Sequence, residues 1–331
     1  MTLPLDLIQT LQHSQAIEAW AAVLHHAWSL CSKPLTPGKA VSEVLARDRA
    51  LGDVDHYLAT AGWDLWTEYQ ASVPHTAQRL SDWWAAHAPG RAVLILDAFS
   101  LREAPWILQQ AEVRGFIVQQ AGVTGAELPP NTTPFAKALG FGQRSSLGNN
   151  GAGNTHCFPG ARTESVDIAW DDCAALIGAE PDWVFWHQWP DHRLHDHDDP
   201  GKGLQTLTEE VEAHLTGDAF WSLVERLATG RRLVITADHG YAASGQFTDT
   251  NAEQSDYLKR RYKSGRAVRG DESPGAWVPP IDLSLESPHG RHLYVNGRRK
   301  WKSHGGYPTL THGGLSVLEV AVPFIEISRN K

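Results

Sequence analysis

Four apolar runs in this sequence each adjoin an Asp or a His, and this pattern limits the choice of fold more than any other feature. The runs and their polar residues are VLILDAF with Asp97, WVFWHQWP followed by Asp191 and His195, LVITADHG with Asp238 and His239, and THGGLSVLEVAVPF, near whose start His312 lies. Short continuous runs of Val, Ile and Leu are typical of buried parallel strands, and ligands gather beyond the carboxyl ends of such strands. The pattern therefore predicts an α/β protein with a polar site at one edge of its sheet.

The rest of the chain supplies the helices that such a sheet needs. Residues 4–90 indicate helices because Leu, Ile and Trp recur at helical spacing. Beyond them, strand-like and helix-like segments alternate, which favours a mostly parallel central sheet flanked by helices. We therefore divide the chain into a helical N-terminal region, 1–90, and a catalytic domain, 91–331. Within that domain, 205–229 is predicted as one long amphipathic helix and 243–290 as an excursion from the core.

Charge and cysteine content exclude several classes of protein. A formal net charge of -9 at pH 7 argues against a protein that coats nucleic acid, although it allows a local basic groove. The three Cys residues form no C-x-x-C pair, which indicates a reducing compartment without a disulfide framework. The sequence shows no secretory signal and no apolar stretch that approaches the length of a membrane span. We expect a cytoplasmic protein that does not contact the membrane.

The polar residues next to the apolar runs point to metal chemistry. Three Asp and three His at one sheet edge suit two divalent cations, each held by carboxylate and imidazole groups. Such a pair of cations indicates phosphoryl or sulfuryl transfer. Asp191 and His195 lie one turn apart if their loop is helical, so both can face one ion. The same loop, HQWPDHRLHDHDDP, offers further His and Asp residues that can replace the chosen pair, namely His187, His192, His197, Asp196, Asp198 and Asp199.

Several segments, taken in order, resemble the PglZ branch of the alkaline phosphatase superfamily. They are VLILDAFSLREAP, LPPNTTPFAKALG, VFWHQWPDHRLH, LVITADHGY and THGGLSVLEVAVPF, within residues 91–328. The resemblance implies two metal ions, with Zn²⁺ as the default for Asp/His sites and Mn²⁺ as the alternative. By motif, one ion is expected to bind Asp97, Asp238 and His239, and the other Asp191, His195 and His312.

The segment LPPNT is similar to the L-P-x-x-T motif of that family, which implies Thr132 as the nucleophile. A hydroxyl is a poor nucleophile at neutral pH, and coordination to a metal activates it. Thr133 is a near-equal alternative, because a shift of one residue in this loop is compatible with the sequence. Ser100 is a third candidate, although it also suits the N-cap of a helix that begins at Leu101.

Substrate contacts are expected from basic residues, since Arg recognises phosphate through two parallel hydrogen bonds. Arg and Lys are concentrated between the TADHG turn and the final HGG, where the superfamily usually carries its substrate-binding insertion. We predict substrate contacts from Arg266, Arg269 and His304, and from Arg102, which matches a recurrent Arg in the family's first motif. The segment CFPGAR resembles a sulfatase signature, but its Arg comes one position late and LPPNT already supplies a hydroxyl.

These features predict a metal-dependent phosphoesterase that acts through a phospho-threonine intermediate. A phosphodiester, such as a nucleotide or oligonucleotide, is favoured over a monoester because of the PglZ resemblance and the basic excursion. The resemblance also implies bacterial phage defence or signalling, with region 1–90 as a surface for protein partners. The competing interpretation is a catalytically degenerate module of the same fold that acts through protein interactions. A phosphomutase of this superfamily would need longer substrate-specific domains than the chain offers.

Overall fold

The computed structural model describes residues 3–194, 203–247, 250–262, 265–270, 282–301 and 309–329. Its centre is a six-stranded sheet with the strand order β2-β13-β5-β1-β4-β3. The strands are β1 (Arg91–Leu96), β2 (Phe116–Gly125), β3 (Arg162–Val166), β4 (Asp182–His187), β5 (Arg232–Thr236) and β13 (Ala321–Arg329). All of them run parallel except β13, which is antiparallel to both of its neighbours. The predicted α/β architecture with a mostly parallel sheet is confirmed.

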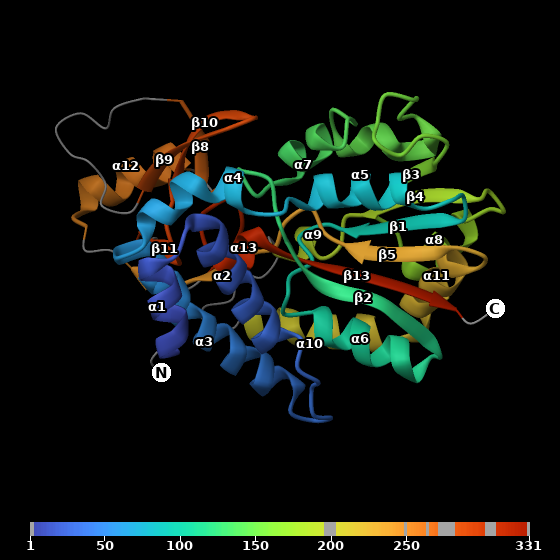
Figure 1. The fold of residues 1–331 in the computed structure, drawn as a ribbon, viewed down its shortest axis with the longest axis horizontal. Coiled ribbons are helices and arrows are strands. Elements are labelled where there is room, and N and C mark those ends of the chain that lie inside the picture. Colours follow the sequence, from blue (N-terminus) through green and yellow to red (C-terminus); the bar gives the residue numbers. More distant parts are fainter. Residues whose placement is uncertain are drawn as a thin grey trace.

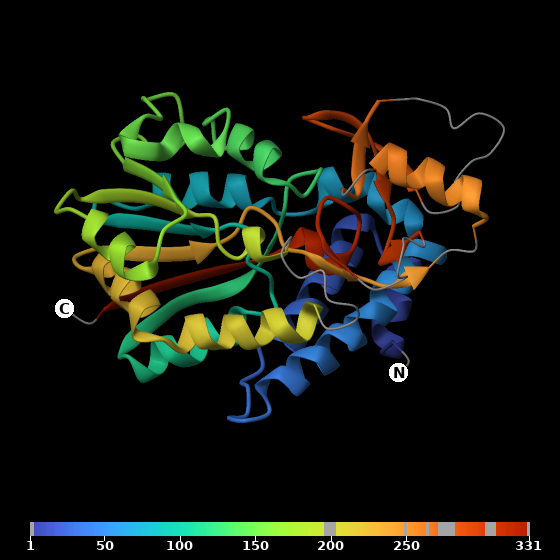
Figure 2. The same ribbon diagram turned by 180° about the vertical axis from the view of Figure 1, so that it is seen from behind.

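The sheet is buried on both faces, as its apolar strands require. In β1, Ala92, Leu94 and Leu96 pack on one face, while Val93 and Ile95 pack on the other. The first face is covered by α6 (Ala104–Val113), α8 (Trp170–Leu176), α10 (Gly203–Thr216) and α11 (Asp218–Ala228). The second face is covered by α5 (Thr76–Ala86), α7 (Thr132–Ala138) and the 3-10 segment η2 (Arg144–Asn150). Figures 1 and 2 show these two helical layers above and below the strands.

The segment 205–229, predicted as one helix, forms two. Helix α10 ends at Thr216 and α11 begins at Asp218, with Gly217 between them in an extended conformation. A Cβ atom at Gly217 would lie 2.9 Å from the carbonyl oxygen of Ala213, so the turn requires glycine. Both helices pack apolar faces on the same core, which is why their periodicity suggests a single helix.

The N-terminal region is helical, as predicted. Its remaining elements are α1 (Leu5–His13), α2 (Ala16–Cys31), α3 (Ala40–Thr60), the 3-10 helix η1 (Trp63–Glu68) and α4 (Tyr69–Ser72). These helices share one apolar cluster with the C-terminal part of the chain, in which Leu51 and Leu58 of α3 belong with Leu315 and Val317. The division of the chain at residue 90 stays a prediction. The apolar cluster includes residues from both sides of that boundary.

A buried network of charges also links α3 to the rest of the protein. The carboxylate of Asp48 accepts hydrogen bonds from Arg102 Nε (3.0 Å) and from Arg298 Nη1 (2.7 Å). Asp55, also on α3, accepts hydrogen bonds from Arg298 Nε (2.6 Å) and from the backbone N–H of Val317 (2.6 Å). Burial alone would raise the pKa of Asp48, but the two guanidinium groups hold it below its usual value.

Replacing Asp48 should therefore destabilise the fold strongly. In Asp48→Ala, two buried guanidinium groups lose their shared counter-charge, which costs about 3–5 kcal/mol in comparable cases. Urea unfolding should show this loss as a lower midpoint at an unchanged slope. Asp64→Ala, at an exposed position of η1, is the matched control and should leave the midpoint in place. A midpoint for Asp48→Ala equal to that of the control would contradict the structural role of the network.

The excursion, predicted over 243–290, is longer in the structure. It takes up the whole segment between β5 and β13 and forms small sheets and helices beside the carboxyl ends of the parallel strands (Figure 1). Its elements are β6 (Ala242–Ser244), β7 (Gln246–Phe247), α12 (Ala252–Tyr262), β8 (Ala267–Arg269), β9 (Asp282–Ser287), β10 (Gly290–Val295), β11 (Arg299–Lys300), β12 (Thr309–Thr311) and α13 (Val317–Val320). Strands β8, β10 and β9 make a three-stranded sheet of their own. The excursion therefore lies where polar residues of the central sheet gather.

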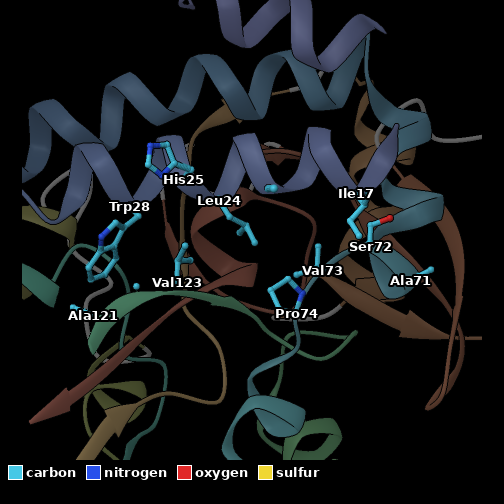
Figure 3. A pocket seen from close by; sticks show the side chains of 12 residues that line it. Ile17, Leu24, His25, Trp28, Ala71, Ser72, Val73, Pro74, Ala121 and Val123 are labelled. Atoms are coloured by element: carbon cyan, nitrogen blue, oxygen red, sulfur yellow. The ribbon is translucent and has the colours of Figure 1, made fainter. Parts of the chain in front are cut away.

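An apolar groove separates α2 from strand β2, the edge strand of the central sheet (Figure 3). Its volume is about 800 Å³, and Leu24 and Trp28 of α2 face Val123 of β2 across it, with Val73 and Pro74 at one side. No Asp, Glu, Lys or Arg is among the described residues that line it. Among the described helices, none is long and apolar enough to cross a membrane.

Candidate metal centre

Five of the six predicted Asp and His ligands converge at the carboxyl edge of the central sheet, and the sixth, His195, lies outside the described residues. Asp97 follows β1, Asp238 and His239 follow β5, and Asp191 begins the short helix α9 (Asp191–Leu194) after β4. Because β1 pairs with β4 on one side and β5 on the other, the three strand ends lie side by side. The backbone N–H of Asp191 donates to the carbonyl of Asp97 (3.1 Å), which fixes the two loops together.

His312 reaches the same place from the far end of the excursion. It follows β12, which pairs antiparallel with β6, and β6 itself comes shortly after His239. Thr311 lies opposite Ala242 in this ladder. The two imidazole rings stack with their centroids 4.4 Å apart and their planes 24° from parallel. A residue about seventy positions away in sequence is thus held against His239 by a short strand pair.

The side chains form two groups of potential ligands, each with all its ligand atoms within 4.8 Å of one another. In the first group, His239 Nε2 lies 3.4 Å from Asp238 Oδ2 and 3.6 Å from Asp97 Oδ1, and all three residues are buried. In the second group, His312 Nε2 lies 3.2 Å from Asp191 Oδ1, with His239 as the third member. The predicted convergence therefore exists, and the binding of metal by these residues stays a prediction.

The hydrogen bonds of both imidazoles fit a bound cation. His239 Nδ1 donates to the carbonyl of Gly240 (2.9 Å) and His312 Nδ1 donates to Asn131 Oδ1 (2.7 Å). Each Nε2 is then a lone-pair acceptor turned toward carboxylate oxygens, which is the usual arrangement of a metal-binding His. Asp238 Oδ2 and His239 Nε2 are buried and make no hydrogen bond within the described residues. Two facing acceptors that have lost water are stabilised by a positive ion between them.

The electrostatics of Asp97 lead to the same conclusion. Burial raises the pKa of its carboxyl group well above the usual value, and the charges of Asp238 and Asp191 raise it further, against the opposing effect of Arg144. Three carboxylates in one buried site repel one another unless cations neutralise them. Asp97 is followed by Ala98, whose φ of 60° is rare for a residue with a side chain. The Ala98 N–H donates to Asp238 Oδ1 (3.0 Å), so the strained turn ties the two carboxylates together.

Asn131 orients His312, and its removal should weaken the centre. In Asn131→Ala the Nδ1–H of His312 loses its acceptor, so the ring no longer has a fixed tautomer or orientation. Loss of such supporting partners costs about 10–100-fold in metal affinity or activity. Competition with a fluorescent chelator would measure this shift, and Lys137→Ala, at an exposed position of α7, is the control. Equal metal affinity in the two variants would rule out the orienting role.

Thr132, the predicted nucleophile, is the first residue of α7, and Asn131 is its N-cap. Its Oγ1 donates toward the Asp97 carboxylate, at 3.3 Å from Oδ1. Thr132 and His312 line a cavity of about 440 Å³ together with Arg266. Thr133 lines the same cavity, so it remains the alternative nucleophile.

Ser100 is fully buried in the turn before α6, which begins at Ala104 and not at Leu101. Its Oγ accepts a hydrogen bond from Arg102 Nη1 (3.1 Å). Ser100 is therefore not the N-cap that the sequence suggests, and its hydroxyl faces the buried charge network.

Two of the arginines predicted to bind substrate, Arg102 and Arg266, instead bind groups of the protein itself. The side chain of Arg102 is 1% exposed and bonds to Asp48, Ser100 and the carbonyl of Tyr241. This enclosed position does not support the predicted contact of Arg102 with substrate, which stays a prediction.

Arg266 borders the cavity, but its guanidinium group binds Glu319 (2.8 Å) and the carbonyls of Gly297 and Arg299. These bonds hold parts of the excursion together, so the predicted substrate contact of Arg266 is not supported either and stays a prediction. Arg269, on β8, is exposed and stays a candidate.

Several predicted or alternative histidines remain to be placed. His195 and His304 lie outside the described residues, as does His197. His187 is buried, and its Nε2 bonds to the carbonyl of Ile168 (2.9 Å). His192 pairs with Asp167 (3.4 Å). Neither of these two belongs to the ligand groups among the described residues.

The structure also brings in two residues that the sequence does not single out. Asn131 contacts His312, and Arg144, the first residue of η2, forms an ion pair with Asp97 Oδ2. Asn131 directly precedes the predicted nucleophile in LPPNT, so its place in that motif is a local sign that it belongs to the site. Arg144 lies in a Gly- and Ser-rich stretch without periodicity, and no local pattern marks it.

The C-terminal half of the sequence matches the model of a known protein family. The model of the PglZ family, described as the BREX system PglZ alkaline phosphatase-like domain, matches residues 161–327. Together with a mostly parallel sheet that carries Asp and His at its carboxyl edge, this match defines an alkaline phosphatase-like protein. The match extends over half of the chain, and the chain belongs to the PglZ family. Asp191, Asp238, His239 and His312 lie within the matched residues, whereas Asp97 and Thr132 precede them.

Among solved structures, the chain is similar to murine ectonucleotide pyrophosphatase/phosphodiesterase 5, with 15% identity and a TM-score of 0.44 over 73% of this chain and 88% of that chain. An inactive form of the same murine protein in complex with AMP gives 14% identity and a TM-score of 0.42, over 72% and 88% of the two chains. No curated protein matches the sequence.

Proposed function

We propose that this PglZ protein is a metal-dependent phosphoesterase with Thr132 as its nucleophile, and that it prefers phosphodiesters. The observation that carries this proposal is the position of the Thr132 hydroxyl, 3.3 Å from Asp97 within the cluster of Asp and His side chains and open to a cavity. A hydroxyl beside clustered metal ligands is the arrangement that nucleophilic phosphoryl transfer requires.

The residues of the chain have separate tasks in this reaction. Asp97, Asp238 and His239 would hold one cation, and Asp191 and His312, with His195 expected as a third ligand, would hold the other. Two bound cations, Zn²⁺ or Mn²⁺, would supply Lewis acidity and lower the pKa of a nearby hydroxyl group. Thr132 Oγ attacks phosphorus, the new O–P bond forms as the bond to the leaving oxygen breaks, and water then hydrolyses the phospho-threonine. Asn131 keeps His312 in the tautomer that this arrangement needs.

The preference for diesters has support in the excursion beside the cavity. Its α12 carries Lys259, Arg260 and Arg261, and β8 carries the exposed Arg269. Basic side chains in this excursion favour a substrate with more than one phosphate, such as an oligonucleotide.

Hydrolysis of two chromogenic esters tests this function. Protein loaded with Zn²⁺ or Mn²⁺ should cleave bis-p-nitrophenyl phosphate with a higher kcat/KM than p-nitrophenyl phosphate, and a chelator should stop both reactions. A higher kcat/KM for the monoester would reverse the substrate preference. Bound metal without hydrolysis of either ester would instead favour the degenerate interaction module.

We also propose that the N-terminal helices contact another protein of the BREX system. Support comes from apolar side chains that face solvent there, since Ile17 of α2 is 57% exposed beside the uncharged groove of Figure 3. An uncharged, aliphatic segment of the partner suits such a lining. Ile17→Glu should abolish co-purification with co-expressed proteins of the system and leave ester hydrolysis unchanged. Val113→Glu, at an exposed position of α6, is the control, and retained co-purification of the Ile17 variant would refute this contact.

A further inference from the structure

A buried carboxylate outside the metal centre, that of Glu127, lies between two histidines from distant parts of the chain. Glu127 is 6% exposed and precedes Thr132 by five positions. Its Oε1 is 3.8 Å from Nδ1 of His75, and its Oε2 is 3.7 Å from Nε2 of His289. Within the described part of the chain, Glu127 pairs with these two imidazole rings. A buried carboxylate needs a compensating positive charge, which an imidazole can supply.

The hydrogen bonds of His75 show how it supplies this charge. Its Nδ1 faces the carbonyl oxygen of Ala126 and its Nε2 faces that of Gln70, each at 3.2 Å. A carbonyl oxygen only accepts, and a neutral imidazole has one N–H, so a neutral ring would set a lone pair against one of the two oxygens. The imidazolium form has an N–H for each oxygen. The surroundings of His75 are therefore those of a cation, with the carboxylate of Glu127 beside it.

His289 brings the excursion to the same carboxylate. It lies in the turn between β9 and β10, and its Nε2 is buried without a hydrogen bond among the described residues. Ser287, two positions earlier, donates its hydroxyl to the carbonyl of Leu128 (2.8 Å), which follows Glu127 directly. The β9–β10 turn is thus attached to this segment by a neutral hydrogen bond, and its imidazole faces the carboxylate.

On the other side of the carboxylate, the N-terminal region contacts the end of β2. The N–H of Gly125 donates to the carbonyl of Pro74 (2.9 Å). A Cβ atom at Gly125 would collide with Cγ1 of Val73, so this close approach requires glycine. Val73 and Pro74 also line the groove of Figure 3, and His75 follows them directly. The histidine is therefore joined to the wall of that groove.

We propose that Glu127 and the imidazolium of His75 form a buried ion pair that positions segment 126–131, which leads to Thr132, with His289 as a second partner of the carboxylate. The ion pair joins the N-terminal region to this segment, and removal of either partner would leave a buried charge uncompensated. Glu127 belongs to neither group of potential metal ligands, so it is a positioning residue and not a catalytic one. The inference goes beyond the proposed function and does not depend on ester hydrolysis.

Nitrogen NMR of the histidine rings tests the charge of His75 in chelator-treated protein. At neutral pH, both ring nitrogens of His75 should have the chemical shifts of an imidazolium, with His75→Gln used to assign the signals. In Glu127→Gln, which keeps the size of the side chain and removes its charge, one of these nitrogens should move to the shift of an unprotonated nitrogen. A neutral His75 ring in the wild type, or an unchanged imidazolium in Glu127→Gln, would overturn the ion pair.

Glu286→Gln is the matched control for this experiment. Glu286 belongs to the same β9–β10 hairpin as His289, but its side chain is 64% exposed and pairs with Arg291. Its replacement should leave the His75 signals as they are in the wild type.

Hydrogen exchange tests the positioning of the segment. The N–H groups of Gly125 and Ala126 donate to the carbonyls of Pro74 and Val320. Both should exchange about 10–100-fold faster in Glu127→Gln than in Glu286→Gln, the effect of losing an interaction with a charged group. His75→Gln should accelerate the same two groups, and it provides the measurement if Glu127→Gln does not fold. Exchange rates equal to those of the control would overturn the positioning role.

The results also separate this ion pair from the proposed function, because neither measurement uses a substrate. If esters are hydrolysed and the His75 ring is neutral, the phosphoesterase proposal stands and the ion pair fails. If the imidazolium and the faster exchange are both observed but no ester is hydrolysed, the ion pair stands and the phosphoesterase proposal fails.

Discussion

Thr132→Ala should lower kcat for bis-p-nitrophenyl phosphate by about 10³-fold or more, the scale of losing a covalent nucleophile. The substitution removes the hydroxyl that lies 3.3 Å from Asp97 Oδ1, on a residue that lines the cavity. The variant keeps all the Asp and His side chains of the two ligand groups, so the metal content should not change. Steady-state kinetics and metal analysis on the same sample would show both halves of this result.

The neighbouring residue provides the control for this prediction. Thr133→Ala removes an equivalent hydroxyl from the same cavity, and its kcat should stay near that of the wild type. If Thr133→Ala is inactive and Thr132→Ala active, the nucleophile moves by one residue. If both variants are active, threonine attack is wrong, and a mechanism without a covalent intermediate takes its place.

Asp238→Asn should remove the metal-dependent activity by removing a ligand. Oδ1 of Asp238 accepts backbone hydrogen bonds from Ala98 and His239, and an amide oxygen at this position can keep both. Oδ2, which faces His239 Nε2, becomes an amide nitrogen that cannot bind a cation. We expect at least one metal equivalent to be lost and kcat to fall by about 10³-fold or more, since the metal supplies the activated nucleophile. Asp238→Ala should lose the same activity.

An exposed carboxylate provides the comparison. Asp256→Asn, on the solvent-facing side of α12, should bind the full complement of metal and keep its activity. Circular dichroism should show that Asp238→Asn remains folded. A folded Asp238→Asn protein with full metal content and full activity would refute the assignment of this centre.

Strands β1, β4 and β5 could be predicted from the sequence because each carries a local signal. β1, β4 and β5 are uninterrupted apolar runs, and the Asp or His that follows each one marks the carboxyl edge. Strand β3 was missed because its sequence, RTESV, is that of a polar edge strand. The direction of β13 could not be inferred either, because parallel and antiparallel strands in a buried position have the same apolar composition.

The site residues that directly follow a strand could be predicted from the sequence. Those that reach the site through contacts between distant segments could not. Arg144 contacts a carboxylate 47 positions away, and Asn131 contacts an imidazole 181 positions away. Arg102 shows the same limit, because the family motif predicts a substrate contact for it whereas its guanidinium group binds Asp48. Its partner, Asp48, comes from the N-terminal helices, where the sequence shows no reason for a buried acid.

Strand β13 has a consequence for how this protein is made. It lies between β2 and β5, and β2 has no other strand neighbour in the central sheet. During synthesis, residues 116–125 leave the ribosome roughly 200 residues before the strand that pairs with them, so their backbone must wait without a partner. The sheet can therefore close only after residues 321–329 have been translated, and a ribosome-bound chain that stops before them should be far more sensitive to protease than the released protein.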